Sequence, residues 1–212
     1  DYLGEPVHIR LMFRSGIIGA LPRMGKTFTL RQLLLACSLD PTVELHIYDL
    51  KGGADFLSMG EGIPFGTGVC HAFRSGSGPD DAAAMLADLQ AMRADMEKRY
   101  ARIRAIVKED LSRCPEGKVT RELANDRSLG LHPVVLAIDE TQVCFSDWEQ
   151  AKEFTAIVTD LVKRGPAAGI ITLLATQNVD SATIPKSISR MASIRFALRV
   201  TDHVATDLIL GT

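Results

Sequence analysis

The chain has 212 residues, which is enough for one domain with a complete hydrophobic core but few for two. Hydrophobic residues make up 46% and charged residues 24% of it, as is ordinary for a globular protein, and the formal net charge is −2. This charge argues against a strongly basic protein that coats nucleic acid, while a local basic patch remains compatible with it. We therefore expect one domain over residues 1–212, and we expect it to be part of a longer chain.

The cysteines and histidines show no disulfide or metal-binding spacing. Four cysteines are scattered without a CxxC pair, and the five histidines do not follow the spacing of a metal site, so we expect them in the core or on the surface. No apolar run reaches the roughly 20 residues that span a bilayer, and no secretory signal is visible. We expect a reducing, cytoplasmic location, at the inner face of the cell membrane through segments outside this chain.

Short apolar runs alternate with longer amphipathic segments along the chain. This pattern predicts strands at residues 16–20, 43–49, 133–139, 169–176 and 194–200, and helices at 25–39, 80–111 and 147–164. Two of the strands, 133–139 and 169–176, are apolar without interruption, as in strands whose two faces are both covered. We therefore expect an α/β fold with a mostly parallel sheet and helices on both faces.

The first predicted strand leads into "GALPRMGKT" (19–27), which fits the phosphate-binding pattern GxxxxGK[ST] except that Ala20 replaces its first glycine. Such a loop turns from a strand into a helix and presents backbone N–H groups to phosphates, and its lysine and hydroxyl serve the β- and γ-phosphates and Mg²⁺. We expect nucleotide contacts from Ala20, Pro22, Arg23, Met24, Gly25, Lys26, Thr27 and Phe28. The alternative is a chance GKT at a turn between a strand and a helix.

Two later strands end in polar side chains of the kind that nucleotide hydrolysis requires. "VVLAIDE" (134–140) ends in Asp139, the position of a Mg²⁺ ligand beside Thr27, and in Glu140, which can activate the attacking water. "LLATQ" (173–177) delivers Gln177 to the same edge, where it could sense the γ-phosphate. The alternatives are a helix cap for the acid pair and a strand cap for the second stretch. We predict Glu140 and Gln177 as catalytic residues and ATP with Mg²⁺ as the ligands; the chain has no NKxD run, which argues against a small GTPase.

Together these stretches resemble the motor domain of the FtsK/SpoIIIE family of DNA-pumping ATPases, over nearly the whole chain. The resemblance is carried by the phosphate-binding loop, "ELHIYDLKG", "VVLAIDE", "LVKRGPAAGIITLLATQNVDSATIP" and "IRFALRVTDHVATDLILG". The version here is most similar to actinobacterial members, including TraB-like conjugative plasmid transfer proteins. The resemblance implies a RecA-like fold, a homo-hexameric ring around double-stranded DNA, and ATP-driven movement of chromosomal or plasmid DNA.

The sequence departs from the family pattern in ways that leave other functions open. Pro166 stands where the family often has an arginine, so that arginine's role in a neighbouring subunit's site is missing or falls to Arg164, Arg195 or Arg199. Asn178-Val179 likewise replaces the Arg-Pro of the family's "ATQRP" segment. One alternative is a type VII secretion (EccC-like) ATPase, which shares this module but moves protein. A further alternative is a nucleotide-binding assembly module that hydrolyses poorly.

Basic residues mark candidate contacts with a DNA backbone, where each lysine or arginine neutralises a phosphate. We expect Lys51, which follows the second strand, and Lys186 and Arg190, which follow the Gln177 loop, to lie in loops at the carboxyl ends of the strands and to contact DNA. The alternative for each is an ordinary surface position. The long helix at 80–111 carries further basic residues between acids, which is typical of a solvated face.

Overall fold

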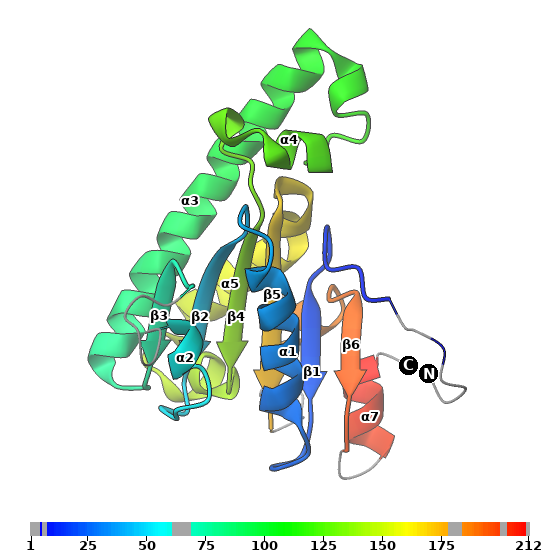
Figure 1. The fold of residues 1–212 in the computed structure, drawn as a ribbon. Coiled ribbons are helices and arrows are strands. Elements are labelled where there is room, and N and C mark those ends of the chain that lie inside the picture. Colours follow the sequence, from blue (N-terminus) through cyan, green and yellow to red (C-terminus); the bar gives the residue numbers. More distant parts are fainter. Residues whose placement is uncertain (1–4, 6–7, 61–68, 178–183, 200–202, 211–212) are drawn as a thin grey trace.

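The computed structural model describes residues 5, 8–60, 69–177, 184–199 and 203–210 (Figure 1). Its centre is a six-stranded sheet of order β3-β2-β4-β5-β1-β6, in which every neighbouring pair is parallel. The strands are β1 (Gly16–Gly19), β2 (Glu44–Asp49), β3 (Ala72–Ser75), β4 (Val134–Asp139), β5 (Ile170–Thr176) and β6 (Ile194–Ala197). All strands therefore end at one edge of the sheet, the carboxyl edge, and begin at the opposite amino edge.

Helices cover both faces of the sheet, which confirms the predicted α/β architecture. One face carries α1 (Lys26–Ser38) and α2 (Leu57–Gly60), and the other carries α3 (Pro79–Glu109), α5 (Ala151–Arg164) and α6 (Lys186–Ser189) (Figure 1). Successive side chains of a strand point to opposite faces. In β4, Leu136 and Ile138 accordingly join the core under α3 and α5, while Val135 and Ala137 join the core under α1. This explains why the strand is apolar from Val134 to Ile138, before Asp139 at its end.

Helix α3 is longer than the strands against which it packs. Its 31 residues span about 46 Å, and its far end projects past the amino edge, where α4 (Arg121–Asn125) packs beneath it (Figure 1). The sequence pattern suggested a solvated charged face, but Arg99 is buried. Its guanidinium pairs with Asp95 and donates to the carbonyls of His132 at 2.6 Å and Ala168 at 3.3 Å. Arg99 therefore ties the helix to the sheet and is not available to DNA.

Several element boundaries differ from those that the sequence predicted. β3 and α7 (His203–Leu210) were not predicted, and α5 begins at Ala151 because a π-helical turn, η3 (Val143–Asp147), precedes it. The last strand ends at Ala197, and Val200 lies outside the described residues. Short 3₁₀ turns complete the chain as η1 (Leu111–Arg113), η2 (Arg127–Leu129) and η4 (Gly165–Ala168). No helix within the described ranges is long and apolar enough to cross a membrane.

Candidate functional site

The loop between β1 and α1 is built to present backbone N–H groups at the carboxyl edge. It is anchored to the neighbouring strands, because Ala20 N donates to the Thr176 carbonyl at 3.3 Å and Leu21 N to the Arg199 carbonyl at 2.7 Å. Gly25 ends the loop with φ +89°, a left-handed conformation that glycine adopts at little cost. The first turn of α1 has neither a side-chain cap nor an acidic residue. Its N–H groups and the helix dipole therefore favour an anion at this end.

The side chains of the loop separate into buried and exposed positions. Ala20 is fully buried and does not have a positive φ, so the alanine fits a position where the pattern has glycine. The intervening and following side chains point to solvent, and they are Pro22, Arg23, Met24 and Phe28. Lys26, in contrast, is buried. The positions that the phosphate-binding pattern leaves unspecified therefore face solvent, whereas its lysine points into the protein.

Lys26 meets the acid pair that follows β4. Its Nζ lies 2.5 Å from Asp139 Oδ1 and 2.5 Å from Glu140 Oε1, and all three side chains are buried. The Thr27 hydroxyl donates to Asp139 Oδ2 at 3.0 Å. Residues more than a hundred positions apart in the sequence therefore share one network of charged hydrogen bonds at the carboxyl edge.

Glu140 is held from the other side by two glutamines. Gln142 Nε2 donates to its Oε2 at 2.7 Å, and Gln177 Nε2 donates to its Oε1 at 2.5 Å. The Thr176 hydroxyl in turn donates to Gln142 Oε1 at 2.8 Å. Glu140 has φ +58°, a left-handed conformation that costs a non-glycine residue about 1–2 kcal/mol. The sequence did not single out Gln142, whose only signal is its place two residues after Glu140.

The site holds more negative than positive charge. Two carboxylates, Asp139 and Glu140, face the single ammonium group of Lys26. Burial, opposed by Lys26 and reinforced by the charge of Glu140, raises the pKa of Asp139. The surplus negative charge favours a further cation beside these oxygens.

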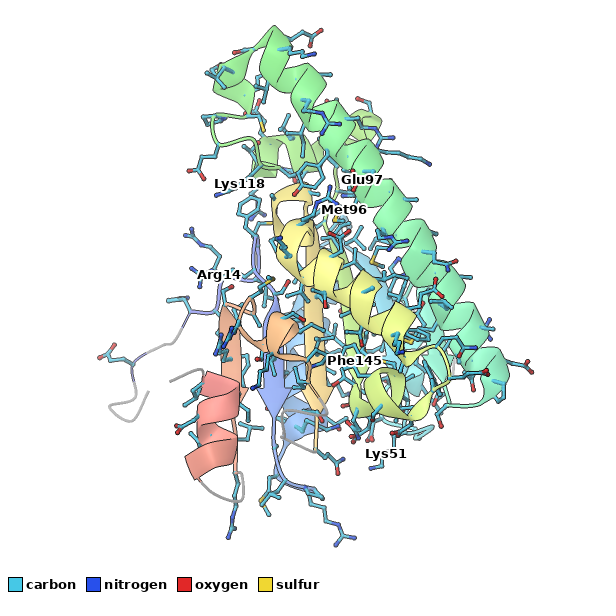
Figure 2. The ribbon with its side chains drawn as sticks, turned by 180° about the vertical axis from the view of Figure 1, so that it is seen from behind. Arg14, Lys51, Met96, Glu97, Lys118 and Phe145 are labelled. Atoms are coloured by element: carbon cyan, nitrogen blue, oxygen red, sulfur yellow. The ribbon has the colours of Figure 1, made fainter. Side chains whose placement is uncertain are left out.

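The three basic residues predicted to contact DNA do not lie together. Asp49 at the end of β2 accepts from the backbone N–H groups of Lys51 and Gly53, both at 3.1 Å, and Lys51 is exposed at the carboxyl edge (Figure 2). Lys186 and Arg190 are also exposed, but they begin and follow α6 on the face that α5 covers. The expectation that all three belong to loops at the carboxyl edge is wrong for these two, because the chain returns across that face before entering β6.

The candidate replacements for the family arginine differ in their surroundings. Arg164 lies 2.6 Å from Glu97 of α3 and stacks over the Tyr100 ring. Arg195 donates to the carbonyls of three residues, Ser189, Ala192 and Ile209. Arg199 is exposed, and its carbonyl accepts from the phosphate-binding loop. Of these three arginines, Arg199 is therefore the one that lies next to the loop with its side chain in solvent. Asn178 and Val179, the other departure from the family pattern, lie outside the described residues.

No family model and no curated protein matches this sequence. Solved structures do match its fold. The pCW3 conjugation coupling protein TcpA, in a monomer form with ATPγS, matches 99% of this chain with a TM-score of 0.73 at 15% identity. The cytoplasmic domain of the type VII secretion ATPase EccC from Thermomonospora curvata matches 94% with a TM-score of 0.65 at 23% identity. EssC (ATPases 2 and 3) from Geobacillus thermodenitrificans matches 87% with a TM-score of 0.63 at 17% identity.

These likenesses concern the fold and only part of each larger protein. The chain spans 55% of the TcpA chain, 22% of the EccC chain and 32% of the EssC chain. The shared architecture is an α/β fold with a parallel sheet, consistent with the RecA-like fold that the family resemblance implied.

Proposed function

We propose that this chain is the ATP-hydrolysing motor module of a DNA translocase of the FtsK/SpoIIIE type. One observation carries the proposal: the lysine of a phosphate-binding loop, two strand-end carboxylates and a strand-end glutamine form one buried network. Lys26, Asp139, Glu140 and Gln177 make this network, and the N-terminus of α1 opens beside it.

Nucleotide binding uses the loop and Lys26. Phosphate oxygens accept from the uncapped N–H groups at the start of α1, and the positive end of the helix dipole adds to this attraction. Lys26 exchanges its contact with Glu140 for the β- and γ-phosphates, which its flexible stem allows. The oxygens of Thr27 and Asp139 are the hard ligands that suit Mg²⁺, and when bound this ion neutralises phosphate charge.

In hydrolysis, Glu140 acts as the general base. Once Lys26 turns to the phosphates, the carboxylate of Glu140 can take a proton from the water that attacks the γ-phosphate. Gln142 and Gln177 fix its orientation from the other side, and Gln177 reaches toward the γ-phosphate. A left-handed backbone at Glu140 turns its side chain back over the loop, which accounts for a conformation that is otherwise unfavourable.

Lysine substitution tests nucleotide binding directly. Lys26→Ala removes the cation of the loop and should abolish binding of fluorescent ATPγS. Lys163→Ala removes an exposed lysine of α5 and should leave binding unchanged. Equal affinity of Lys26→Ala and the parent chain would refute the nucleotide site.

Double-stranded DNA is the favoured substrate within a homo-hexameric ring. Lys51 would contact its phosphates from the carboxyl edge, and Lys186 and Arg190 would contact them from the face that α5 covers. TcpA supports this choice, because the match to a conjugation coupling protein covers nearly the whole chain. Removing all three basic side chains should weaken duplex binding equally across sequences and lower its salt slope by about one unit per lost phosphate contact. Basal hydrolysis should persist. If DNA stimulated ATP hydrolysis equally in the parent and in the triple variant, the DNA would have to bind at other residues.

Protein transport is the second candidate, favoured by the likeness to EccC and EssC and by a net charge of −2. The two functions separate in one assay, in which ATP hydrolysis is measured with random duplex DNA and with secretion-signal peptides. Stimulation by peptide and not by DNA would put protein transport first. Hydrolysis that neither stimulates would favour the poorly hydrolysing assembly module that Pro166 suggested. Attachment to a membrane would come from segments outside this chain.

A further inference from the structure

Three histidines converge on one carboxylate at the amino edge, at the far ends of the strands that carry the acid pair. Glu44 is the first residue of β2, and its Oε1 lies 2.8 Å from His46 Nε2 and 3.8 Å from His71 Nε2. Its Oε2 lies 2.9 Å from His132 Nε2. His71 directly precedes β3 and His132 closely precedes β4, so the register of three adjacent strands brings these groups together.

The ring of His46 is oriented as metal-binding histidines are. Its Nε2 faces Glu44, while its Nδ1 lies 2.7 Å from Asp88 Oδ2 in α3. Asp88 also accepts from the Tyr48 hydroxyl. In metal sites, an outer carboxylate of this kind fixes the tautomer and direction of the ligating imidazole. His46 is buried, which protects this arrangement, whereas the His71 side chain is 64% exposed and free to adjust.

Two carboxylates face the ring of His46. Glu44 Oε1 lies 2.8 Å from its Nε2, and Asp88 Oδ2 lies 2.7 Å from its Nδ1. This arrangement of two carboxylates around one imidazole favours a cation beside Glu44.

We propose that Glu44, His46 and His71 bind a divalent transition-metal ion, with His132 as a fourth ligand. The ligand atoms of the first three lie within 4.8 Å of one another. In a tetrahedral Zn²⁺ site with metal–ligand distances of about 2.0–2.1 Å, ligand atoms lie about 3.4 Å apart, so these side chains would have to move closer together on binding. Imidazole-rich sites of this kind take Zn²⁺, Ni²⁺ or Cu²⁺ in preference to Mg²⁺ or Ca²⁺.

Such an ion would act as a structural tie. It would join the starts of β2, β3 and β4, and through Asp88 it would hold α3 against the same edge. β3 is an edge strand of only four residues that pairs with β2 alone, so it gains from a further link. The site is separate from the Mg²⁺ position, because it lies at the opposite ends of the strands and has a different donor set.

Cobalt titration tests the proposal on the 212-residue chain. Co²⁺ is added in the presence of millimolar Mg²⁺, which occupies the oxygen ligands of the carboxyl edge, and visible absorbance reports four-coordinate Co²⁺. We expect one saturable equivalent with micromolar or tighter affinity, displacement by Zn²⁺, and a rise in melting temperature with Zn²⁺. Absence of a saturable equivalent would overturn the proposal and leave the cluster as ion pairs alone.

The variants are chosen so that folding and binding separate. His71→Ala removes an exposed side chain without a hydrogen bond to Glu44, so the metal-free chain should melt as the parent does while affinity falls at least about tenfold. Asp88→Asn should weaken binding by about 10–100-fold through His46. Cys70→Ser and His8→Ala are controls that should bind as the parent does, because Cys70 packs against the core under α1 and His8 is not part of the cluster. Equal affinity in His71→Ala and the parent, or a thiolate band lost in Cys70→Ser, would refute the assigned ligands.

Discussion

Replacing Glu140 by glutamine separates the chemistry of its carboxylate from its part in the buried network. Lys26 Nζ, Gln142 Nε2 and Gln177 Nε2 all donate to this carboxylate, at 2.5, 2.7 and 2.5 Å. A glutamine keeps an oxygen for Lys26 and Gln177 but turns an NH₂ group toward Gln142. Gln142 can answer by turning its amide over, and the Thr176 hydroxyl, which donates to Gln142 Oε1, would then accept instead. The hydrogen bonds that join residues 140, 142, 176 and 177 can therefore form again in the variant, while the Thr176 hydroxyl gives up Gln142 as its acceptor.

The expected loss of stability follows from this exchange. The bonds from Gln142 and Gln177 lose their charged acceptor and fall from about 1.5–3 kcal/mol to about 0.5–1.5 kcal/mol each, while the bond from Lys26 keeps its charged donor. Removal of the Glu140 charge offsets part of this loss, because this charge repels the buried carboxylate of Asp139. Burial and the Glu140 charge both raise the pKa of Asp139, whereas Lys26 lowers it. We expect the free energy of unfolding to fall by about 1–3 kcal/mol in urea denaturation, so the variant remains folded.

The expected loss of hydrolysis is larger. Without a base, phosphate release should slow by about 10²–10⁴-fold, which corresponds to about 3–5 kcal/mol in the barrier. ATPγS affinity should hold or increase, because Lys26 loses one of its two competing carboxylates. Single-turnover phosphate release and fluorescent ATPγS binding measure the two effects. Glu149→Gln, the same change at an exposed position, is the control. Phosphate release at the parent rate would remove Glu140 from the chemistry, and loss of binding would make it a structural partner of Lys26.

Other changes test the loop, the fold and assembly. Gly25→Ala and Gly117→Ala both force alanine into a left-handed backbone and should each cost about 1–2 kcal/mol of stability, but only the change at Gly25 should impair ATPγS binding. Arg99→Met should lower the free energy of unfolding by about 3–5 kcal/mol, because it leaves Asp95 and two carbonyls without their partner, whereas Arg104→Met at an exposed position should change it by less than about 0.5 kcal/mol. Arg199→Ala should slow hydrolysis in an assembled ring and not in the isolated chain, which we expect to sediment mostly as a monomer; an equal effect in both would exclude a role across subunits.

The sheet was predictable where its strands are continuous runs of mostly apolar residues. β4 and β5 are buried on both faces, so their residues are apolar except for Asp139, Thr172 and Thr176, and neither strand can be mistaken for a loop. β3 escaped prediction because its four residues form an edge strand that is only partly buried, and an edge strand needs no continuous apolar pattern. The predicted helix began at 147, but Asp147 ends η3 and Trp148 has an extended backbone, so α5 begins only at Ala151.

The candidate site was predictable for a different reason. Asp139 ends β4, Gln177 directly follows β5, and Lys26 begins the helix after the loop that follows β1. Parallel strands bring such residues to one edge whatever their separation in sequence. Gln142 escaped because it lies in the turn after the acid pair, where its direction depends on the left-handed backbone at Glu140. Lys186 and Arg190 were misplaced because the sequence does not reveal how far a loop travels before its next helix.

The two edges of the sheet show why one group of polar residues was read from the sequence and the other was not. At the carboxyl edge, the loop and the acid pair form contiguous stretches, and each has a chemical reason that can be stated before the fold is known. At the amino edge, Glu44 and His46 lie at the start of β2, while His71 and His132 come just before β3 and β4, so the spacing of the four residues carries no pattern. A local trace did exist, because Glu44 and His46 alternate with Leu45 and therefore share the face of β2 that α3 covers. Two polar residues on a covered face must find partners, and this requirement predicts a polar cluster before its other members can be named.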